Sequence, residues 1–469
     1  MATLRLAAWS ASLQLTDLPA PVVQAAVRSF YNWTGCALGG SNHRTTTTAL
    51  DALAPFFGKP TSSILGHQSS SSSLTSSPGD NGNGKADASH AALINGIASH
   101  VHDYDDTHLE TIIHPTGPVA SALLAQAEAL GKPVGGDEFI VALVAGIEAE
   151  CKVGLAVWPK HYDIGWHITS TTGSIGAAVA VGKLLNLTTE QMAHAIGIAA
   201  TQVTGLREMF GSDTKSFHVG RAAQNGLMAA VLASKGYTSS TQALEAKRGW
   251  VNVVSETQRV DDAVATLGTV WETEKNSFKP FPCGIVVHPI IDACIQLHRD
   301  MQQRGLAASQ ISRVRCTVHP LVLELTGKKT PKDGLQAKFS VYHGGAVGLV
   351  LGKAGPAQYE DAVVTSDEIV SVRDKIAATA DAALGADEAV IVVEFDAGGA
   401  GGSGAPTTLT KHVQHAIGSL EVPMTDAQLQ DKFIDQVTPV LGAQGAKKAS
   451  DTVLALRSVT DVSVLAGGL

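Results

Sequence analysis

Histidine and aspartate crowd into one short segment of the chain. Residues 100–115, with the sequence HVHDYDDTHLETIIHP, contain four histidines, three aspartates and Thr107. Charged side chains are rarely buried without partners, so packing alone does not explain such a run. Asp103 and His114 are therefore candidates for proton transfer, and Thr107 for substrate binding; the ordinary alternative is a solvated, capped helix end. Zinc binding is a third interpretation, but the segment has no His-x-x-x-His or Cys-x-x-Cys pattern, and we predict no metal.

Three further segments place a histidine or a lysine where a loop is expected to meet a helix. His167 precedes the run ITSTTG, Lys215 lies shortly before Arg221, and Lys279 lies in the loop FKPFPCG ahead of His288. A helix N-terminus attracts carboxylates and lowers the pKa of an adjacent imidazole. Taken singly, these residues also fit a core histidine, solvated surface cations and a structural loop. Together with the acidic segment, they indicate binding of several carboxylates and proton transfer at carbon.

The elements that position these residues fall into two regions. Up to about residue 265, apolar residues at helical spacing predict helices over 4–15, 21–38, 118–130, 136–158, 174–185, 189–204 and 220–235. Farther on, the pattern predicts a helix over 287–301, a strand over 312–319 and a hairpin of strands 388–395 and 407–412. The tail, 425–441 and 449–456, should be helical and pack on the first region. The sequence therefore predicts a mainly α protein with a smaller α+β domain.

Two low-complexity runs carry no predicted function. Ser69–Gly84 is too rich in serine and glycine to bury a core, and it predicts a flexible surface insertion. Residues 398–404 are glycine-rich, but they lack the Gly-Lys-Ser/Thr ending of a phosphate loop. We interpret them as a mobile hairpin tip.

Composition limits the partners of the protein. A formal net charge of −9 disfavours nucleic acid and anionic membranes, and no apolar run reaches the roughly 18 residues of a membrane span. The five cysteines are widely spaced and predict buried, reduced thiols. Met1–Leu15 lacks the long apolar core of a signal peptide. We predict a cytoplasmic protein, with a mitochondrial location left open.

The motifs resemble those of the MmgE/PrpD family along nearly the whole chain. The matching stretches are DYDDTH…HP at 103–115, GWH at 165–167, TKSFHVGRAAQNG at 214–226, FKPFP…H at 278–288 and KFSVYHGGA at 338–346. The resemblance implies a large helical domain over 1–268 and 406–469, and an α+β lid domain over 269–405. It also implies a homodimer, no metal or other cofactor, and an active site between the two domains.

The resemblance also suggests which residues act. Active-site positions of the decarboxylase branch match here at Asp103, Thr107, His114, His167, Lys215 and Lys279. A histidine and a tyrosine of that branch instead fall on Gly284 and near Leu323.

We expect a lyase that moves a proton at the carbon next to a carboxylate of a small polycarboxylic acid. Asp103, His114, His167 and Lys215 are the predicted catalytic residues; the predicted substrate-binding residues are Thr107, Lys279, His288 and Arg221. Dehydration of a 2-methylcitrate or alkylcitrate, with protonated His114 as the acid, is the first expectation. The alternatives are decarboxylation of a cis-aconitate-like acid, epimerisation of an iminodisuccinate-like acid, and a non-catalytic homologue that binds a carboxylate.

Overall fold

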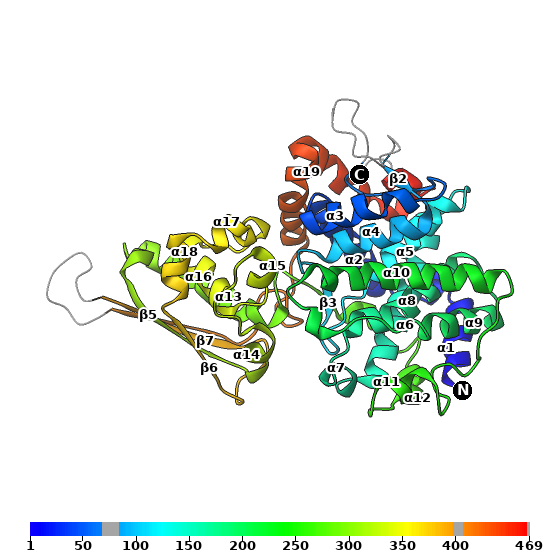
Figure 1. The fold of residues 1–469 in the computed structure, drawn as a ribbon, viewed down its shortest axis with the longest axis horizontal. Coiled ribbons are helices and arrows are strands. Elements are labelled where there is room, and N and C mark those ends of the chain that lie inside the picture. The colour runs from blue at the N-terminus through cyan, green and yellow to red at the C-terminus, as the bar shows by residue number, and fades with distance from the viewer. Residues whose placement is uncertain (68–83, 397–406, 467–469) are drawn as a thin grey trace.

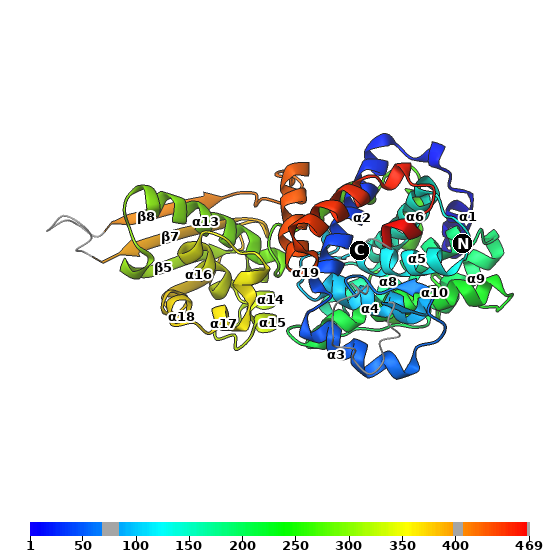
Figure 2. The ribbon, with the colours of Figure 1, turned by 90° about the horizontal axis from the view of Figure 1, so that it is seen from above.

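The computed structural model describes residues 1–67, 84–396 and 407–466 of the chain. A larger helical region carries both termini, and a smaller α+β region projects from one side of it (Figures 1 and 2). The predicted fold class is confirmed. Apart from Gly84, the serine-rich run falls outside the described residues, as does the glycine-rich hairpin tip.

The helical region contains each helix that the sequence predicts there. Helix α9 ends at Ala200, before the predicted residue 204, whereas α8 and α10 begin earlier than predicted. The region consists of α1 (Ala2–Ser12), α2 (Ala20–Gly40), α3 (Arg44–Leu53), α4 (Ala88–His100), α5 (Thr116–Ala129), α6 (Gly136–Val157), α7 (Lys160–Asp163), α8 (Ile168–Leu184), α9 (Thr189–Ala200), α10 (Asp213–Ser234), α11 (Trp250–Val254) and α12 (Val260–Ala265).

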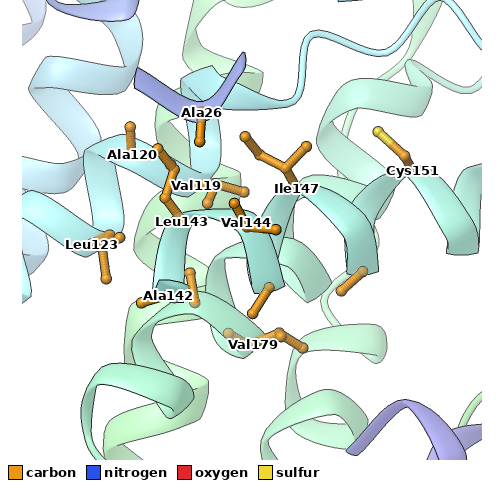
Figure 3. Packing of buried hydrophobic residues seen from close by; sticks show 14 of the residues in the cluster. Ala26, Val119, Ala120, Leu123, Ala142, Leu143, Val144, Ile147, Cys151 and Val179 are labelled. Atoms are coloured by element: carbon orange, nitrogen blue, oxygen red, sulfur yellow. The ribbon is translucent and has the colours of Figure 1, made fainter. Parts of the chain in front are cut away.

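Small residues let the central helices of this region pack closely. A Cβ atom added to Gly96 of α4 would lie 2.6 Å from the Cα of Gly220 in α10, so both positions need glycine. Helix α6 lies in the middle, with apolar residues buried around its whole circumference. Figure 3 shows part of this core, in which residues of α6 meet Ala26 of α2, Val179 of α8, and Val119, Ala120 and Leu123 of α5.

The tail packs on the first region, as predicted. Helix α19 (Asp426–Leu454) lies against α2, and Phe433 stacks on Tyr31 with ring centroids 4.5 Å apart. Gly442 interrupts α19 with φ 70° and ψ 167°. This break explains why the sequence pattern predicts two separate tail helices.

The smaller region is a four-stranded sheet with helices packed against it (Figure 2). The strand order is β6-β5-β7-β8, with β6 parallel to β5 and the other neighbours antiparallel. Its strands are β5 (Ile311–Val318), β6 (Ile376–Ala380), β7 (Ala389–Phe395) and β8 (Thr408–Val413), and its helices are α13 (His288–Gln303), α14 (Pro320–Thr326), α15 (Gly334–Ala337), α16 (Val341–Leu351), α17 (Asp361–Val364) and α18 (Asp367–Arg373). The three predicted strands are confirmed, whereas β6 was not predicted.

The hydrophobic cores divide later in the chain than the predicted domain bounds. Phe278 still packs in the helical core, and the lid core runs from Phe281 to Ala416 before Met424 returns to the helical one. The helical core thus gives way to the lid core between Phe278 and Phe281, and returns between Ala416 and Met424. The domain bounds at residues 268 and 405 stay a prediction, and residue 405 lies outside the described residues.

All five cysteines are buried free thiols, as predicted. In the described ranges, no helix is both long and apolar enough to cross a membrane.

Candidate active site

A small pocket opens where the helical region meets the lid. Its volume is about 40 Å³. The pocket brings together five of the predicted site residues: Asp103, His114, His167, Lys215 and Lys279. The rest of the lining is largely apolar, with Ile112, Tyr162 and Phe210 on the helical side and Gly284, Ile285, Val286, Leu325, Thr326 and Phe339 on the lid side.

A short antiparallel strand pair joins the segment at residues 100–115 to the loop that carries Lys279. Strand β3 (Asp106–His108) pairs with β4 (Asn276–Phe278), so Asp103 and Lys279 come together although they are far apart in sequence. The Nζ atom of Lys432 in α19 donates to the carbonyl oxygens of Tyr104 at 2.6 Å and Lys279 at 2.8 Å. One buried ammonium of the tail thus fixes the residue next to Asp103 and the backbone of Lys279.

Asp103 is the point where the two pocket lysines converge. Its Oδ1 accepts hydrogen bonds from the Nζ atoms of Lys215 and Lys279, each at 2.8 Å. Burial alone would raise the pKa of Asp103, but the charges of Lys215 and Lys279 hold it well below its ordinary value. Burial also lowers the pKa of Lys215. Asp103 is therefore ionised, and it holds two cations that an anionic substrate could recruit.

His114 presents its Nε2 atom toward Asp103. Its Nδ1–H donates to the Asp106 carbonyl oxygen at 2.7 Å, because a carbonyl can only accept. The neutral ring therefore keeps a lone pair on Nε2, which lies 3.9 Å from Oδ1 of Asp103. Burial and the charge of Lys279 lower the pKa of His114 to about 3. Burial therefore disfavours, in the site without a ligand, the protonated His114 that the sequence analysis expected.

His167 occupies the N-cap of α8, which begins at Ile168, earlier than the sequence pattern predicted. Its Nδ1 lies 3.0 Å from Nδ1 of His218 in α10. Its ring also packs edge-on against Phe210, with centroids 5.1 Å apart. Burial and the neighbouring His218 lower the pKa of His167 well below its ordinary value. This second imidazole facing the pocket is therefore also neutral.

Behind the pocket lies a dyad that the sequence analysis did not single out. Nδ1 of His100 and Oδ2 of Asp105 are 2.7 Å apart, and both side chains are buried. The ring of His100 lies 5.0 Å from that of His114 and 5.9 Å from that of His167. The only signal in the sequence was that both residues belong to the crowded segment at 100–115.

Three predicted substrate-binding residues do not line this pocket. Thr107 is buried behind it, with Oγ1 3.2 Å from Nδ1 of His114. His288 is buried in the lid, where its ring packs edge-on against Phe281. Arg221 bonds to Gln224 on the same helix, and Gln224 bonds to Ser89. A direct role in binding stays a prediction for these residues, and Thr107 is the one placed to influence a pocket group.

Several described side chains could in principle hold a metal ion. One group of His100, Asp103 and His114 lies at the pocket, and two others are His108 with Glu110 and Glu272, and Asp387 with His415 and Glu421. At the pocket, a cation would have to compete with two ammonium groups already bound to Asp103. The arrangement therefore favours an anionic ligand over a metal ion.

Comparisons with known proteins identify the family to which the chain belongs. Two sequence models match the chain, the MmgE/PrpD N-terminal domain over residues 4–263 and the MmgE/PrpD C-terminal domain over residues 281–458. A cis-aconitate decarboxylase-like protein, oryM, of Aspergillus oryzae is 27% identical over 99% of this chain and 96% of its own length. The cis-aconitate decarboxylase of Aspergillus terreus is 25% identical over 97% of this chain and 93% of its own. The 2-methylcitrate dehydratase of Salmonella typhimurium is 26% identical over 45% of each chain. The chain therefore belongs to the MmgE/PrpD family.

Proposed function

We propose that the protein is a lyase that decarboxylates a small polycarboxylic acid of the cis-aconitate type. The observation that carries the proposal is the convergence of Lys215 and Lys279 on one carboxylate oxygen of Asp103, beside the neutral rings of His114 and His167. Two buried ammonium groups can exchange this internal carboxylate for one of the substrate, while an imidazole carries a proton.

The lid side of the pocket favours loss of carbon dioxide over loss of water. A leaving hydroxyl needs an acid. Apart from Lys279, which is bonded to Asp103, the only side-chain donor among the described lid residues of this pocket is Thr326, whose hydroxyl donates to the Val322 carbonyl. A carboxylate held against Ile285, Val286 and Phe339 would be poorly solvated, which promotes its departure. The relatives matched over nearly their full length also bear the decarboxylase name.

The chemistry requires one proton from the protein. As the carbon–carbon bond to the leaving carboxylate breaks, its electron pair forms a new double bond. The pair of the former double bond then takes up a proton at the carbon next to another carboxylate. Lys215 and Lys279 would stabilise the charge that this second carboxylate gains. His114 or His167 would deliver the proton, once the negative charge of the bound substrate has raised the pKa of the ring.

Binding must separate the lid from the helical region. A volume of about 40 Å³ holds a few water molecules and is too small for a six-carbon tricarboxylate. The lid contributes one side of the pocket through Gly284, Leu325 and Phe339. We therefore propose that the lid opens to admit the substrate and closes again to exclude water.

Dehydration is the second candidate. The apolar lid would also accommodate the alkyl group of an alkylcitrate, and shorter matches cover 2-methylcitrate dehydratases. Lys215 would then be the acid, because burial lowers its pKa. Cofactor independence, the homodimer and the cytoplasmic location stay predictions from the sequence.

Proton NMR of the purified protein in deuterated buffer tests the proposal. The substrates are cis-aconitate, citrate, 2-methylcitrate and iminodisuccinate. The proposal expects cis-aconitate to give an itaconate-like product carrying one deuterium. New vinyl signals from a citrate would show dehydration instead, and exchange without net change would show epimerisation. A raised melting temperature without turnover of any acid would identify a non-catalytic carboxylate-binding protein.

A further inference from the structure

The two histidines that meet at the pocket wall share a hydrogen bond of an unusual kind. Nδ1 of His167 lies 3.0 Å from Nδ1 of His218. A neutral imidazole carries a proton on only one of its nitrogens, so one ring must donate and the other accept. Either ring can take either role, because no backbone group fixes the tautomer of either one among the described residues.

The other pocket histidines have partners that block such an exchange. His114 donates its Nδ1–H to a backbone carbonyl, which does not return a proton. His100 directs Nδ1 at Asp105, and its Nε2 is buried with no partner among the described residues. His167 differs from both, because its partner has a second titratable nitrogen of its own.

His218 also lies on the outer side of the pair. His167 lines the pocket, whereas His218 does not, yet 5% of its surface is exposed. Only the half-buried Gly205 covers the pair on this side, and it adopts a φ of 104°. A Cβ atom added to Gly205 would lie 3.3 Å from Cγ of His218 and 3.2 Å from Cβ of His167. The flanking residues Thr201 and Leu206 are exposed.

We propose that His218 is a proton-relay residue that connects His167 to solvent outside the pocket. A proton from water enters at Nε2 of His218, and the proton on its Nδ1 passes to Nδ1 of His167. His167 then gives the proton on its Nε2 to the substrate carbon, which leaves both rings neutral with the Nδ1 proton now on His167. When the lid opens after the reaction, Nε2 of His167 takes a proton from water, the Nδ1 proton returns to His218, and Nε2 of His218 releases its proton to solvent, which restores the starting tautomers. The relay rests on the proposed function, since decarboxylation of this kind takes up one proton in each turnover, whereas dehydration releases none and consumes none overall.

The charges around the pair suit a relay that holds a proton only briefly. His100 and Lys215 face both rings, and His114 also faces His167. These cationic or potentially cationic groups disfavour a resting imidazolium. A proton would therefore enter the pair when the negative charge of a substrate offsets Lys215.

The first test uses the resting protein and needs no substrate. The 15N spectrum of histidine-labelled protein should show Nδ1 of one ring protonated and Nδ1 of the other unprotonated, joined by a hydrogen bond. His218→Asn should remove the partner signal and change the Nδ1 shift of His167. Two unprotonated Nδ1 atoms in the wild-type protein would overturn the relay, whatever the protein catalyses.

The second test is kinetic. Asn can still bond to Nδ1 of His167 but cannot pass a proton through its side chain. We expect His218→Asn to lower kcat by about a hundredfold, with KM little changed and a larger solvent deuterium effect. Added imidazole should partly rescue His218→Gly.

His161→Gln is the matched control. His161 is also buried, and it bonds to Thr171 of α8, the helix that His167 caps. This variant should keep nearly full activity. An unchanged kcat and isotope effect in His218→Asn would overturn the relay even if the protein proves to be a decarboxylase. Absence of turnover in the wild-type protein would instead count against the proposed function, and the NMR result would then decide the relay alone.

Discussion

Two cavities share a wall between the helical region and the lid, and they differ in nearly every property that matters for chemistry. Neighbours in the chain form the shared wall and face different cavities. Asp103 and Phe339 line the candidate active site, whereas the residues before them, His102 and Lys338, line the second cavity. The second cavity is far larger, about 470 Å³ against about 40 Å³. The volume of a cavity therefore does not show which of the two carries out the reaction.

Arg44, Asp333 and Asp361 of the second cavity each have a separate local partner, and their charges do not converge. Arg44 pairs with Asp213, Asp333 caps the backbone of Gln336, and Asp361 accepts from the backbone of Gly334. In the smaller cavity, two ammonium groups meet at one oxygen of Asp103. We infer that the smaller cavity is the reactive one, because its buried charges meet at one point.

The largest expected effect is the loss of a converging ammonium. Lys215→Met should lower kcat/KM by about a thousandfold, because a charge that stabilises the reacting carboxylate is lost. Steady-state kinetics on the acid identified by NMR would measure this, with circular dichroism to check folding.

Lys338→Met provides the matched control for Lys215→Met. Lys338 is also buried, and burial lowers its pKa to about 8, but it lines the second cavity. We expect a loss below about tenfold, because its charge reaches Asp103 only through space. Equal losses in the two variants would contradict the division of roles between the cavities.

The next effect concerns proton transfer. His167→Gln should lower kcat by about a hundredfold while leaving the fold intact, since general acid–base groups contribute on that scale. His102→Gln, on the second cavity, should have little effect. A His167→Gln variant that retains most of its activity would remove His167 from the mechanism.

The sequence predicted the pocket residues better than the elements that carry them. Helix α8 begins at Ile168 although the pattern predicted residue 174, and α10 begins at Asp213 although it predicted residue 220. Both missed turns bury polar side chains, namely Thr169 and Ser170 in α8 and Lys215 and His218 in α10. Apolar periodicity does not detect a helix face built from polar side chains.

Other parts of the site had no usable signal in the sequence. The three-residue strands β3 and β4 are too short for a pattern, yet they bring Asp103 to Lys279. The pairing of His167 with His218 depends on how α8 and α10 pack. Such contacts follow from tertiary structure, which a single sequence does not reveal without a resemblance.

A third prediction concerns pH, because histidines at or beside both cavities have lowered pKa values. Burial, with nearby cations, lowers the pKa of His114 to about 3 and those of His218 and His43 to about 4. Below the ordinary histidine pKa of about 6.5, the unfolded chain binds protons that the folded chain does not bind. The free energy of unfolding should therefore fall as pH drops from about 6.5 to about 4, by up to about 1.4 kcal/mol per pH unit for each such histidine.

Urea unfolding at a series of pH values would measure this dependence. His43→Asn, on the second cavity, and His114→Asn, on the first, should each reduce the slope by a similar amount. A free energy of unfolding that stays constant between pH 6.5 and 4.5 would show that these rings are not held neutral.

The smallest expected effect is at Arg221. Its side chain bonds to Gln224 and does not line the pocket, so Arg221→Gln should change kcat/KM by less than about twofold. A large rise in KM would restore Arg221 to the substrate-binding role that the sequence analysis gave it.

A crystal structure with bound citrate tests the comparison most directly. We predict a carboxylate of the ligand within hydrogen-bonding distance of Nζ of Lys215 and of Lys279, with at least one of these lysines released from Asp103 and the lid displaced. A ligand bound instead to Lys338 and Arg44 in the larger cavity, with both lysines still on Asp103, would contradict the proposed site.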